Sequence, residues 1–196
     1  MALALDRTAL HLCIDMQRLF AEPTPWFVPW MPRILPRVVD IARRHSDRTI
    51  FTRFIPVERP DTAVGAWRDY YTQWREVTRE FLDPRLLELM EPLCGFAPPA
   101  RVFDKAVYSA FGSGRLRQYL RVRQASTLIV TGGETDVCVL ATVLAAIDLG
   151  YRVVLPLDAL CSAHDSTHDA LVTLYSERFS RQIETTTTEQ LLSAWD

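Results

Sequence analysis

Three residues of this 196-residue chain could together cleave a small carbonyl compound: Cys138, Asp15 and Lys105. Cys138 follows an apolar run, in or near the first turn of an expected helix, where the unpaired amides favour a thiolate. A thiolate attacks carbonyl carbon, and the same amides could hold the resulting oxyanion. Cys138 is therefore a candidate nucleophile, although an unselected cysteine is more often a small buried apolar residue.

Asp15 and Lys105 have the residue types that such a nucleophile needs beside it. Asp15 ends an apolar run, so it would emerge where a general base can act; a turn or cap residue is the alternative interpretation. Lys105 is the single lysine among 21 arginines, and only an ammonium shifts its pKa readily. It could pair with both the carboxylate and the thiolate, or be an ordinary surface lysine.

The segment before Cys138 is expected to bend sharply. Gly132 and Gly133 permit a tight turn there, and Thr135 or Asp136 is placed to cap the following helix.

The elements that must position these residues are short apolar strands and helices. Short apolar runs alternate along the chain with segments of helical period, which is typical of a parallel α/β sheet. Two helices are predicted in detail. Pro32–His45 has an apolar stripe, whereas Asp136–Leu149 is apolar nearly all round and is therefore expected to be buried. Six strands are predicted, at Ala9–Asp15, Thr49–Phe54, Arg101–Phe103, Thr127–Thr131, Arg152–Pro156 and Gln182–Thr186. Ligands of such sheets bind beyond the carboxyl ends of the strands.

Composition narrows the class of partner. The length and the 48% hydrophobic content suit one domain over 1–196, and a formal net charge of -2 gives no footprint for nucleic acid or a membrane. We expect a cytoplasmic protein with a small-molecule substrate. The four cysteines lack paired spacing and the histidines lie away from Cys138, so free thiols, no metal and no cofactor are expected.

Three motifs resemble the isochorismatase-like cysteine hydrolase superfamily, which includes nicotinamidases, N-carbamoyl amide hydrolases and ureidoacrylate-type amidohydrolases. They are Leu12–Phe20 (LCIDMQRLF), Lys105–Phe111 (KAVYSAF) and Gly132–Val139 (GGETDVCV), and with Asp158–Ser162 they span nearly the whole chain. The resemblance implies a three-layer doubly wound fold with a six-stranded parallel sheet of order 3-2-1-4-5-6. It also implies a homo-oligomer, a dimer or tetramer.

The resemblance further implies a catalytic triad of Asp15, Lys105 and Cys138 and a cis peptide between Gly133 and Glu134. The backbone amides of Glu134 and Cys138 would form the oxyanion hole. The implied activity is hydrolysis of a C–N bond in an amide, carbamoyl or ureido compound through a thioester, with the substrate unidentified.

Two branches of the superfamily fit less well. Nicotinamidases place an Asp-x-His metal site after the second strand, whereas here the run Thr52–Glu58 (TRFIPVE) offers no such ligands. True isochorismatases cleave a vinyl ether without a nucleophilic cysteine, so Cys138 argues against that alternative.

Substrate contacts are expected from the loops around the strand ends. Phe20 follows Asp15 closely, Arg53 could hold a substrate carboxylate or form a structural salt bridge, and Gln17 and Phe111 lie within the motifs. Trp67, Tyr70, Tyr71 and Trp74 share one helical face, for which core or subunit packing is favoured over a pocket wall. Trp67 and Tyr70 are the members proposed to bind substrate.

Two further functions stay open from the sequence. The chain could be a catalytically silent metabolite-binding or regulatory protein of the same fold, which iodoacetamide labelling would separate from an enzyme. A thiol-redox role is disfavoured because Cys138 has no resolving cysteine nearby in sequence, although Cys161 could approach it in space.

Overall fold

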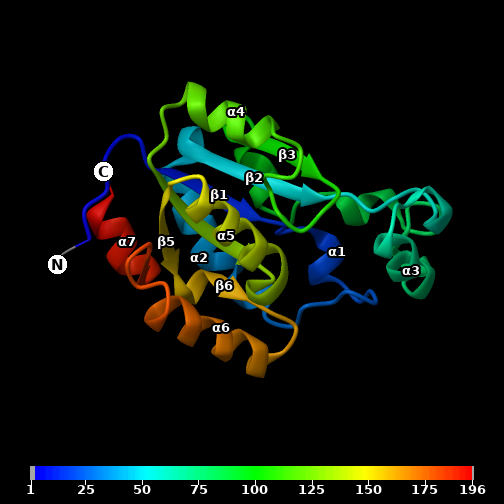
Figure 1. Ribbon diagram of the computed structural model, residues 1–196. Helices are drawn as coiled ribbons and strands as arrows, with labels where there is room; N and C mark the ends of the chain where they lie inside the picture. The colour runs from blue at the N-terminus through cyan, green and yellow to red at the C-terminus, as the bar shows by residue number, and fades with distance from the viewer. Residues whose placement is uncertain (1–2, 196) are drawn as a thin grey trace.

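A parallel sheet forms the centre of the protein in the computed structural model, which describes residues 3–195 (Figure 1). The strands run in the order β3-β2-β1-β4-β5-β7, and the short β6 pairs with the end of β4. They are β1 (Leu10–Ile14), β2 (Thr49–Phe54), β3 (Arg101–Lys105), β4 (Thr127–Gly133), β5 (Arg152–Pro156), β6 (Leu160–Cys161) and β7 (Ile183–Thr186). The predicted α/β class and the predicted strand order are confirmed, with β7 as the sixth predicted strand.

Burial explains why the central strands are apolar runs without alternation. Every residue of β1 and β4 is buried, because helices cover both faces of the sheet. β3 lies at one edge and most of its residues are exposed. β3 and β4 each run two residues further than predicted, to Lys105 and Gly133, so both deliver their last residues to the carboxyl edge.

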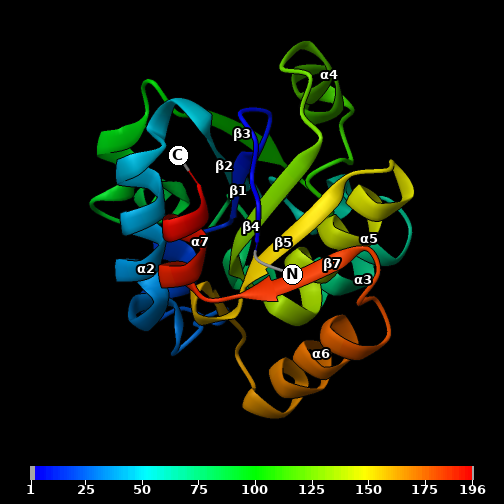
Figure 2. The same cartoon turned by 90° about the vertical axis from the view of Figure 1, so that its left-hand side faces the viewer.

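Helices form the two outer layers (Figure 2). α2 and α7 cover one face and α4, α5 and α6 the other, which completes a three-layer arrangement. The α-helices are α1 (Arg18–Ala21), α2 (Met31–Arg44), α3 (Ala66–Gln73), α4 (Arg115–Val122), α5 (Leu140–Asp148), α6 (Asp165–Glu177) and α7 (Thr188–Ala194). Short 3₁₀ turns occupy Ser46–Arg48, Pro60–Thr62, Arg75–Val77, Pro84–Leu87, Leu93–Phe96 and Leu157–Ala159.

The helix predicted over Asp136–Leu149 differs from its prediction in two ways. It begins as a π-helical turn, Thr135–Val139, and only then continues as α5. It is also not buried all round: Val143 and Ala146 face the core, whereas Leu144 is 36% exposed. An apolar composition does not distinguish a buried helix from one with an uncovered apolar face.

Two connections rise beyond the carboxyl edge of the sheet and frame the space above it. The β2–β3 connection carries α3 and projects from the body, while the chain between β1 and α2 carries α1 (Figure 1). β1 pairs with β2 on one side and with β4 on the other, so the strand order reverses beside it. The crevice expected at such a reversal lies between these connections. No helix within residues 3–195 has the length and apolar content to cross a bilayer.

Candidate active site

Asp15 is the first residue after β1 and is 1% exposed. Its backbone adopts a left-handed conformation with φ +50°, which Asp tolerates better than most residues. Thr52, on the adjacent β2, donates its hydroxyl to Asp15 Oδ1 over 2.6 Å. Oδ2 forms an ion pair with Lys105 Nζ at 2.7 Å and makes no further hydrogen bond. Thr52 therefore fixes one oxygen and leaves the other facing the ammonium.

Lys105 ends β3 and turns its side chain under the pocket floor, where that side chain is 3% exposed. Its Nζ donates to the backbone oxygen of Val107 over 3.1 Å and to Cys138 Sγ over 3.4 Å, besides the ion pair with Asp15. The ammonium also lies 4.8 Å from the centre of the Phe54 ring. Each of its three protons thus has a partner, and one of these partners is the cysteine sulfur.

Cys138 lies in the π-helical turn after β4, and two glycines let that turn approach its neighbours. A side chain on Gly132, whose φ is +99°, would collide with the backbone of Ile14. A Cβ on Gly133 would lie 2.7 Å from the Met31 side chain and 3.2 Å from Cys161 Sγ. The Gly133–Glu134 peptide bond is cis.

Electrostatics keeps the resting site as a thiol beside an ion pair. Burial raises the pKa of Cys138, the negative charge of Asp15 raises it further, and Lys105 offsets only part of this. Burial lowers the pKa of Lys105, but Asp15 and Cys138 outweigh it and the net pKa is raised. The start of a helix favours a thiolate, but burial of the nearly enclosed sulfur opposes that effect in the resting site.

The π-helical turn Thr135–Val139 is held from α6 and β6 by contacts that the sequence did not reveal. Tyr175 donates its hydroxyl to the Thr135 backbone oxygen over 3.0 Å. The Thr135 hydroxyl donates to the Cys161 backbone oxygen over 3.1 Å, so His168 Nδ1, 2.9 Å away, is the donor to that hydroxyl. Thr135 therefore does not cap the helix as predicted.

Two carboxylates also attach the π-helical turn to the chain after β6. Glu134 Oε2 accepts from the Ala163 amide over 2.9 Å, and Asp136 Oδ1 accepts from the Ser162 hydroxyl over 2.7 Å. Asp136 is consequently a latch onto the chain after β6 and does not cap its own helix. A cap between sequence neighbours can be predicted, whereas a latch across 26 residues cannot.

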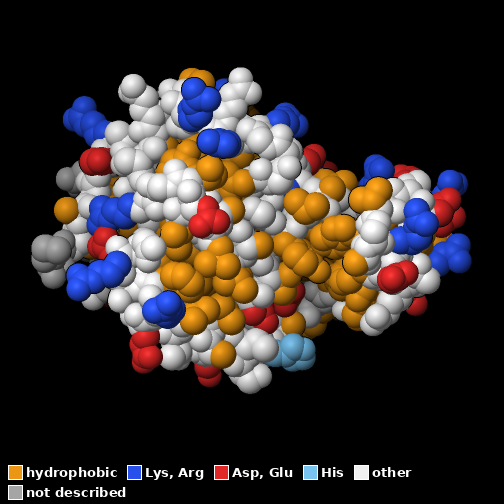
Figure 3. All heavy atoms as spheres, in the orientation of Figure 1, with side chains coloured by type: hydrophobic (Ala, Val, Ile, Leu, Met, Phe, Trp, Pro, Cys, Tyr) orange, Lys and Arg blue, Asp and Glu red, His pale blue; other side chains and the backbone are white. Residues whose placement is uncertain are grey.

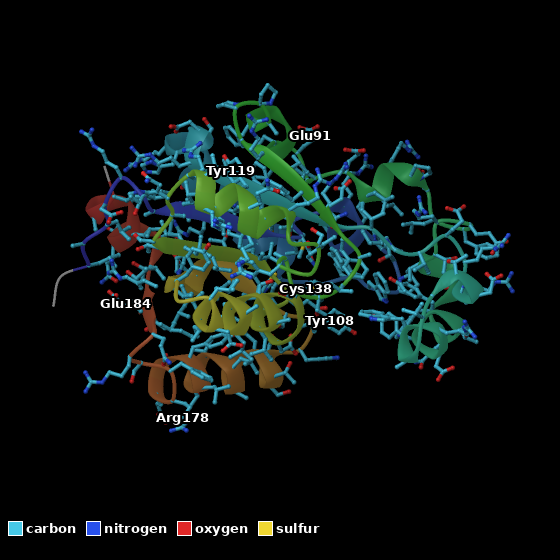
Figure 4. All side chains as sticks on the ribbon, turned by 45° about the horizontal axis from the view of Figure 1, so that its top comes forward. Glu91, Tyr108, Tyr119, Cys138, Arg178 and Glu184 are labelled. Atoms are coloured by element: carbon cyan, nitrogen blue, oxygen red, sulfur yellow. The ribbon has the colours of Figure 1, made fainter. Side chains whose placement is uncertain are left out.

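A pocket of about 400 Å³ opens above Cys138. One wall is mainly aromatic and comes from α1, the loop that follows it, β2, the C-terminal end of α3 and the loop after β3; it consists of Phe20, Pro25, Trp26, Phe27, Phe54, Tyr70, Trp74 and Tyr108. The other wall comes from Glu134, the π-helical turn that follows it and the chain after β6; it consists of Glu134, Asp136, Val137, Ala163 and His164. Figure 4 shows Tyr108 and Cys138 close together at this edge, and Figure 3 shows the hydrophobic groove between the body and the segment carrying α3.

The residues proposed from sequence to bind substrate divide into two groups. Phe20 and Tyr70 line the pocket, and Trp67 packs behind it against Tyr70 and Tyr108, with ring centres 5.4 and 4.8 Å apart. The aromatic set, for which packing was favoured, is divided too, since Tyr70 and Trp74 line the pocket and Tyr71 is buried.

The other three proposed substrate contacts lie elsewhere. Gln17 is fully buried, and its amide bonds to the backbone of Phe54 and Leu87. Arg53 forms a bidentate pair with Asp104 and a further bond to Glu88, which is the structural salt bridge considered as its alternative. Phe111 stacks on Tyr151 away from the pocket, with ring centres 6.1 Å apart. Tyr108 was the missed pocket residue, three positions after Lys105 in the second motif.

The donor groups around Cys138 do not fit a metal centre. Within residues 3–195, no three side chains of His, Cys, Asp or Glu are arranged to hold an ion. Both nearby carboxylates are engaged by Ser162 and Ala163. No step of the chemistry below is therefore derived through a metal.

The chain is similar in sequence and fold to known hydrolases. An uncharacterized isochorismatase family protein, PncA, of Bacillus subtilis (strain 168) is 31% identical over 86 residues, which cover 44% of this chain and 47%, about half, of that relative. A cysteine hydrolase structure from Pseudomonas syringae pv. phaseolicola 1448A is 27% identical, with a TM-score of 0.79 and coverage of 98% of this chain and 97% of that one.

A zinc complex of pyrazinamidase from Pyrococcus horikoshii shares the fold, with a TM-score of 0.72, 22% identity and coverage of 92% of this chain and 99% of that one. The isochorismatase domain family matches residues 9–190, which is most of the chain and includes both the sheet and the pocket. The chain therefore belongs to the isochorismatase family.

Proposed function

We propose that this chain is a cysteine hydrolase that cleaves the C–N bond of a small amide, carbamoyl or ureido compound through a thioester intermediate. The observation that carries the proposal is the arrangement of three groups under one pocket. Lys105 Nζ lies 2.7 Å from Asp15 Oδ2 and 3.4 Å from Cys138 Sγ, and the sulfur lines the pocket floor. A nucleophile, a base and a cation that joins them are the parts that acyl transfer requires.

The first half of the reaction starts from the neutral thiol. Asp15 takes the thiol proton as Cys138 Sγ attacks the carbonyl carbon, so a free thiolate need not accumulate. The backbone amides of Glu134 and Cys138 are the proposed donors to the oxyanion, and such donors are worth about 2.7–4 kcal/mol each in other acyl-transfer enzymes. Asp15 then returns the proton to the departing nitrogen, which leaves as ammonia or an amine.

The second half releases the acid. Asp15, again ionised, takes a proton from water as the water oxygen attacks the thioester carbon. The carbon–sulfur bond breaks, and the proton returns to Cys138. Lys105 stays protonated throughout, because its raised pKa keeps it positive.

Replacement of the nucleophile tests the proposal. In a screen of primary amides, ureas and N-carbamoyl compounds read as ammonia release, Cys138→Ala should reduce kcat by at least about 10⁴-fold. Cys94→Ala is the matched control, since Cys94 is a half-buried surface thiol bonded to Glu91, and it should retain wild-type rates.

Mass spectrometry gives the second readout of the same experiment. Wild-type enzyme quenched in acid during turnover should carry the acyl mass on the peptide that contains Cys138. Turnover by Cys138→Ala at the wild-type rate would sink the proposal.

A further inference from the structure

The active-site pocket carries an uneven distribution of charge. The acidic residues Glu134 and Asp136 line one wall, and none of the described lining residues is Arg or Lys. Lys105 lies beneath the floor and is neutralised by its ion pair with Asp15. A bound group in this pocket would therefore meet negative charge without a cation to balance it.

The cation that sequence alone offered for a substrate carboxylate is committed elsewhere. Arg53 has two bonds to Asp104, at 2.8 and 3.0 Å, and one to Glu88 at 3.1 Å. Reaching the pocket would break all three bonds. His164 is the one lining residue that can become positive, and it is exposed at the rim.

The two carboxylates are fixed at their positions. Their hydrogen bonds from Ser162 and Ala163 hold them against the chain after β6, so they cannot swing away from a ligand. Burial raises the pKa of Glu134. A carboxylate brought into the pocket would be repelled and would lose its water without gaining a partner.

The opposite wall fits a flat apolar group. Trp26 connects its neighbours, with its ring stacked on Phe20 at 6.2 Å and its edge against Phe54 at 5.8 Å. Tyr70 lies 5.9 Å from the same indole. Burial raises the pKa values of Tyr70 and Tyr108, so both phenols stay neutral and add no charge.

Resting on the function proposed above, we propose that the substrates are amides with a flat, apolar acyl group and no negative charge. The pocket admits neutral or cationic aromatic amides and rejects carboxylate-bearing ones, including N-carbamoyl acids. Specificity is then set by Asp136 and Glu134 on one wall and by the indole of Trp26 on the other.

Three amides of the same ring size test the charge preference: benzamide, 4-(aminomethyl)benzamide and 4-carboxybenzamide. Ammonia release at pH 8, where an ordinary histidine is neutral, should be at least about tenfold more efficient, as kcat/KM, for the first two than for the third. Equal or faster hydrolysis of 4-carboxybenzamide would overturn the inference and leave the proposed function standing.

Two variants locate the source of the preference. Asp136→Asn keeps an oxygen to accept from Ser162, and it should make hydrolysis of 4-carboxybenzamide about tenfold more efficient relative to that of benzamide. Ser162→Ala removes the hydrogen bond to Asp136 but keeps the negative charge of its carboxylate. The efficiency of 4-carboxybenzamide hydrolysis relative to that of benzamide should therefore stay low. An unchanged ratio in Asp136→Asn would overturn the assignment to Asp136.

A cation added at the rim gives the converse test. Phe27 lines the pocket and is 40% exposed, so Phe27→Arg should fold and should improve the relative hydrolysis of 4-carboxybenzamide. Phe27→Gln is the control for the lost ring and should not. Ammonia from aliphatic or anionic amides but not from benzamide would overturn the inference alone. No ammonia from any amide, urea or carbamoyl compound would overturn the proposed function as well.

Discussion

The ammonium of Lys105 lies in an enclosed space where a single unpaired charge would be costly. Its ion pair with Asp15 is buried on both sides, with side-chain exposures of 3% and 1%. Removing one partner of such a pair leaves the other uncompensated and costs about 3–5 kcal/mol in other proteins. The two residues proposed for catalysis therefore also bear on the stability of the fold.

A double-mutant cycle tests this coupling at the residue scale. Lys105→Met and Asp15→Asn should each lower the free energy of unfolding by about 3 kcal/mol, and the double variant should lose clearly less than the sum. Urea denaturation of the four proteins at pH 7 measures the difference. Additivity to within about 0.5 kcal/mol would mean that the pair makes no net contribution.

Sequence reasoning at this scale succeeded where residue type was decisive. Lys105 was singled out because it is the one lysine, and Asp15 because it ends an apolar strand. The structure brings both beside Cys138, while their catalytic roles stay a proposal. Burial of the sulfur opposes the thiolate that the start of a helix favours, and this burial depends on packing that no local pattern records.

At the scale of elements, a buried imidazole joins three strands of the sheet. His11 on β1 bonds through Nε2 to the Thr131 hydroxyl on β4 over 2.8 Å, and through Nδ1 to the Thr49 hydroxyl on β2 over 3.2 Å. Burial lowers the pKa of His11 to about 3, with a smaller contribution from His45. The imidazole is therefore neutral in the folded protein at neutral pH.

This neutral histidine makes stability depend on acidity. Because its folded pKa is depressed, its contribution is complete above pH 6.5, the ordinary value, and is lost as pH falls toward about 3. The loss should approach about 1.4 kcal/mol per pH unit in that window. Urea denaturation from pH 7 to pH 4.5 should show a shallower slope for His11→Gln than for wild type.

His164→Gln is the control for that experiment, since His164 is exposed, and it should keep the wild-type slope. Identical slopes for wild type and His11→Gln would show that His11 takes up no proton on unfolding.

Element prediction failed where the backbone departs from a regular period. The run of β-branched and apolar residues in β4 predicted a strand, but its extension to Gly133 depends on pairing with β6, a two-residue strand with no signal of its own. The π-helical turn Thr135–Val139 has helical composition, so it was predicted as ordinary helix. Tyr175 and His168 hold it from α6, and long-range contacts of this kind carry no sequence spacing.

At the scale of the whole molecule, the architecture followed from the sequence because strands and helices alternate with short connections. The β2–β3 connection was predicted only in part, since the helical period of its aromatic residues indicated α3, whereas its several short 3₁₀ turns have no repeating period. It nevertheless supplies pocket residues, so much of the aromatic wall could be recognised only in the structure.

An apolar surface over α5 is the basis for a prediction about assembly. Leu144 on α5 is 36% exposed, and Figure 3 shows hydrophobic side chains gathered over this part of the body. If the proposed homo-oligomer covers this surface, light scattering after gel filtration should give a dimer or tetramer for wild type and a smaller species for Leu144→Glu. Leu174→Glu, on α6, is the control and should keep the wild-type mass. A monomeric wild type would contradict the prediction.

The burial of Lys105 offers a way to measure local opening of the folded protein. It is the sole side-chain amine of the chain, and its Nζ is enclosed by Asp15, Cys138 and the backbone of Val107. Acylating reagents that consume primary amines can reach this side chain only when the enclosure opens. The rate at which Lys105 is acylated therefore measures how often this site opens in the folded protein, and no engineered label is required.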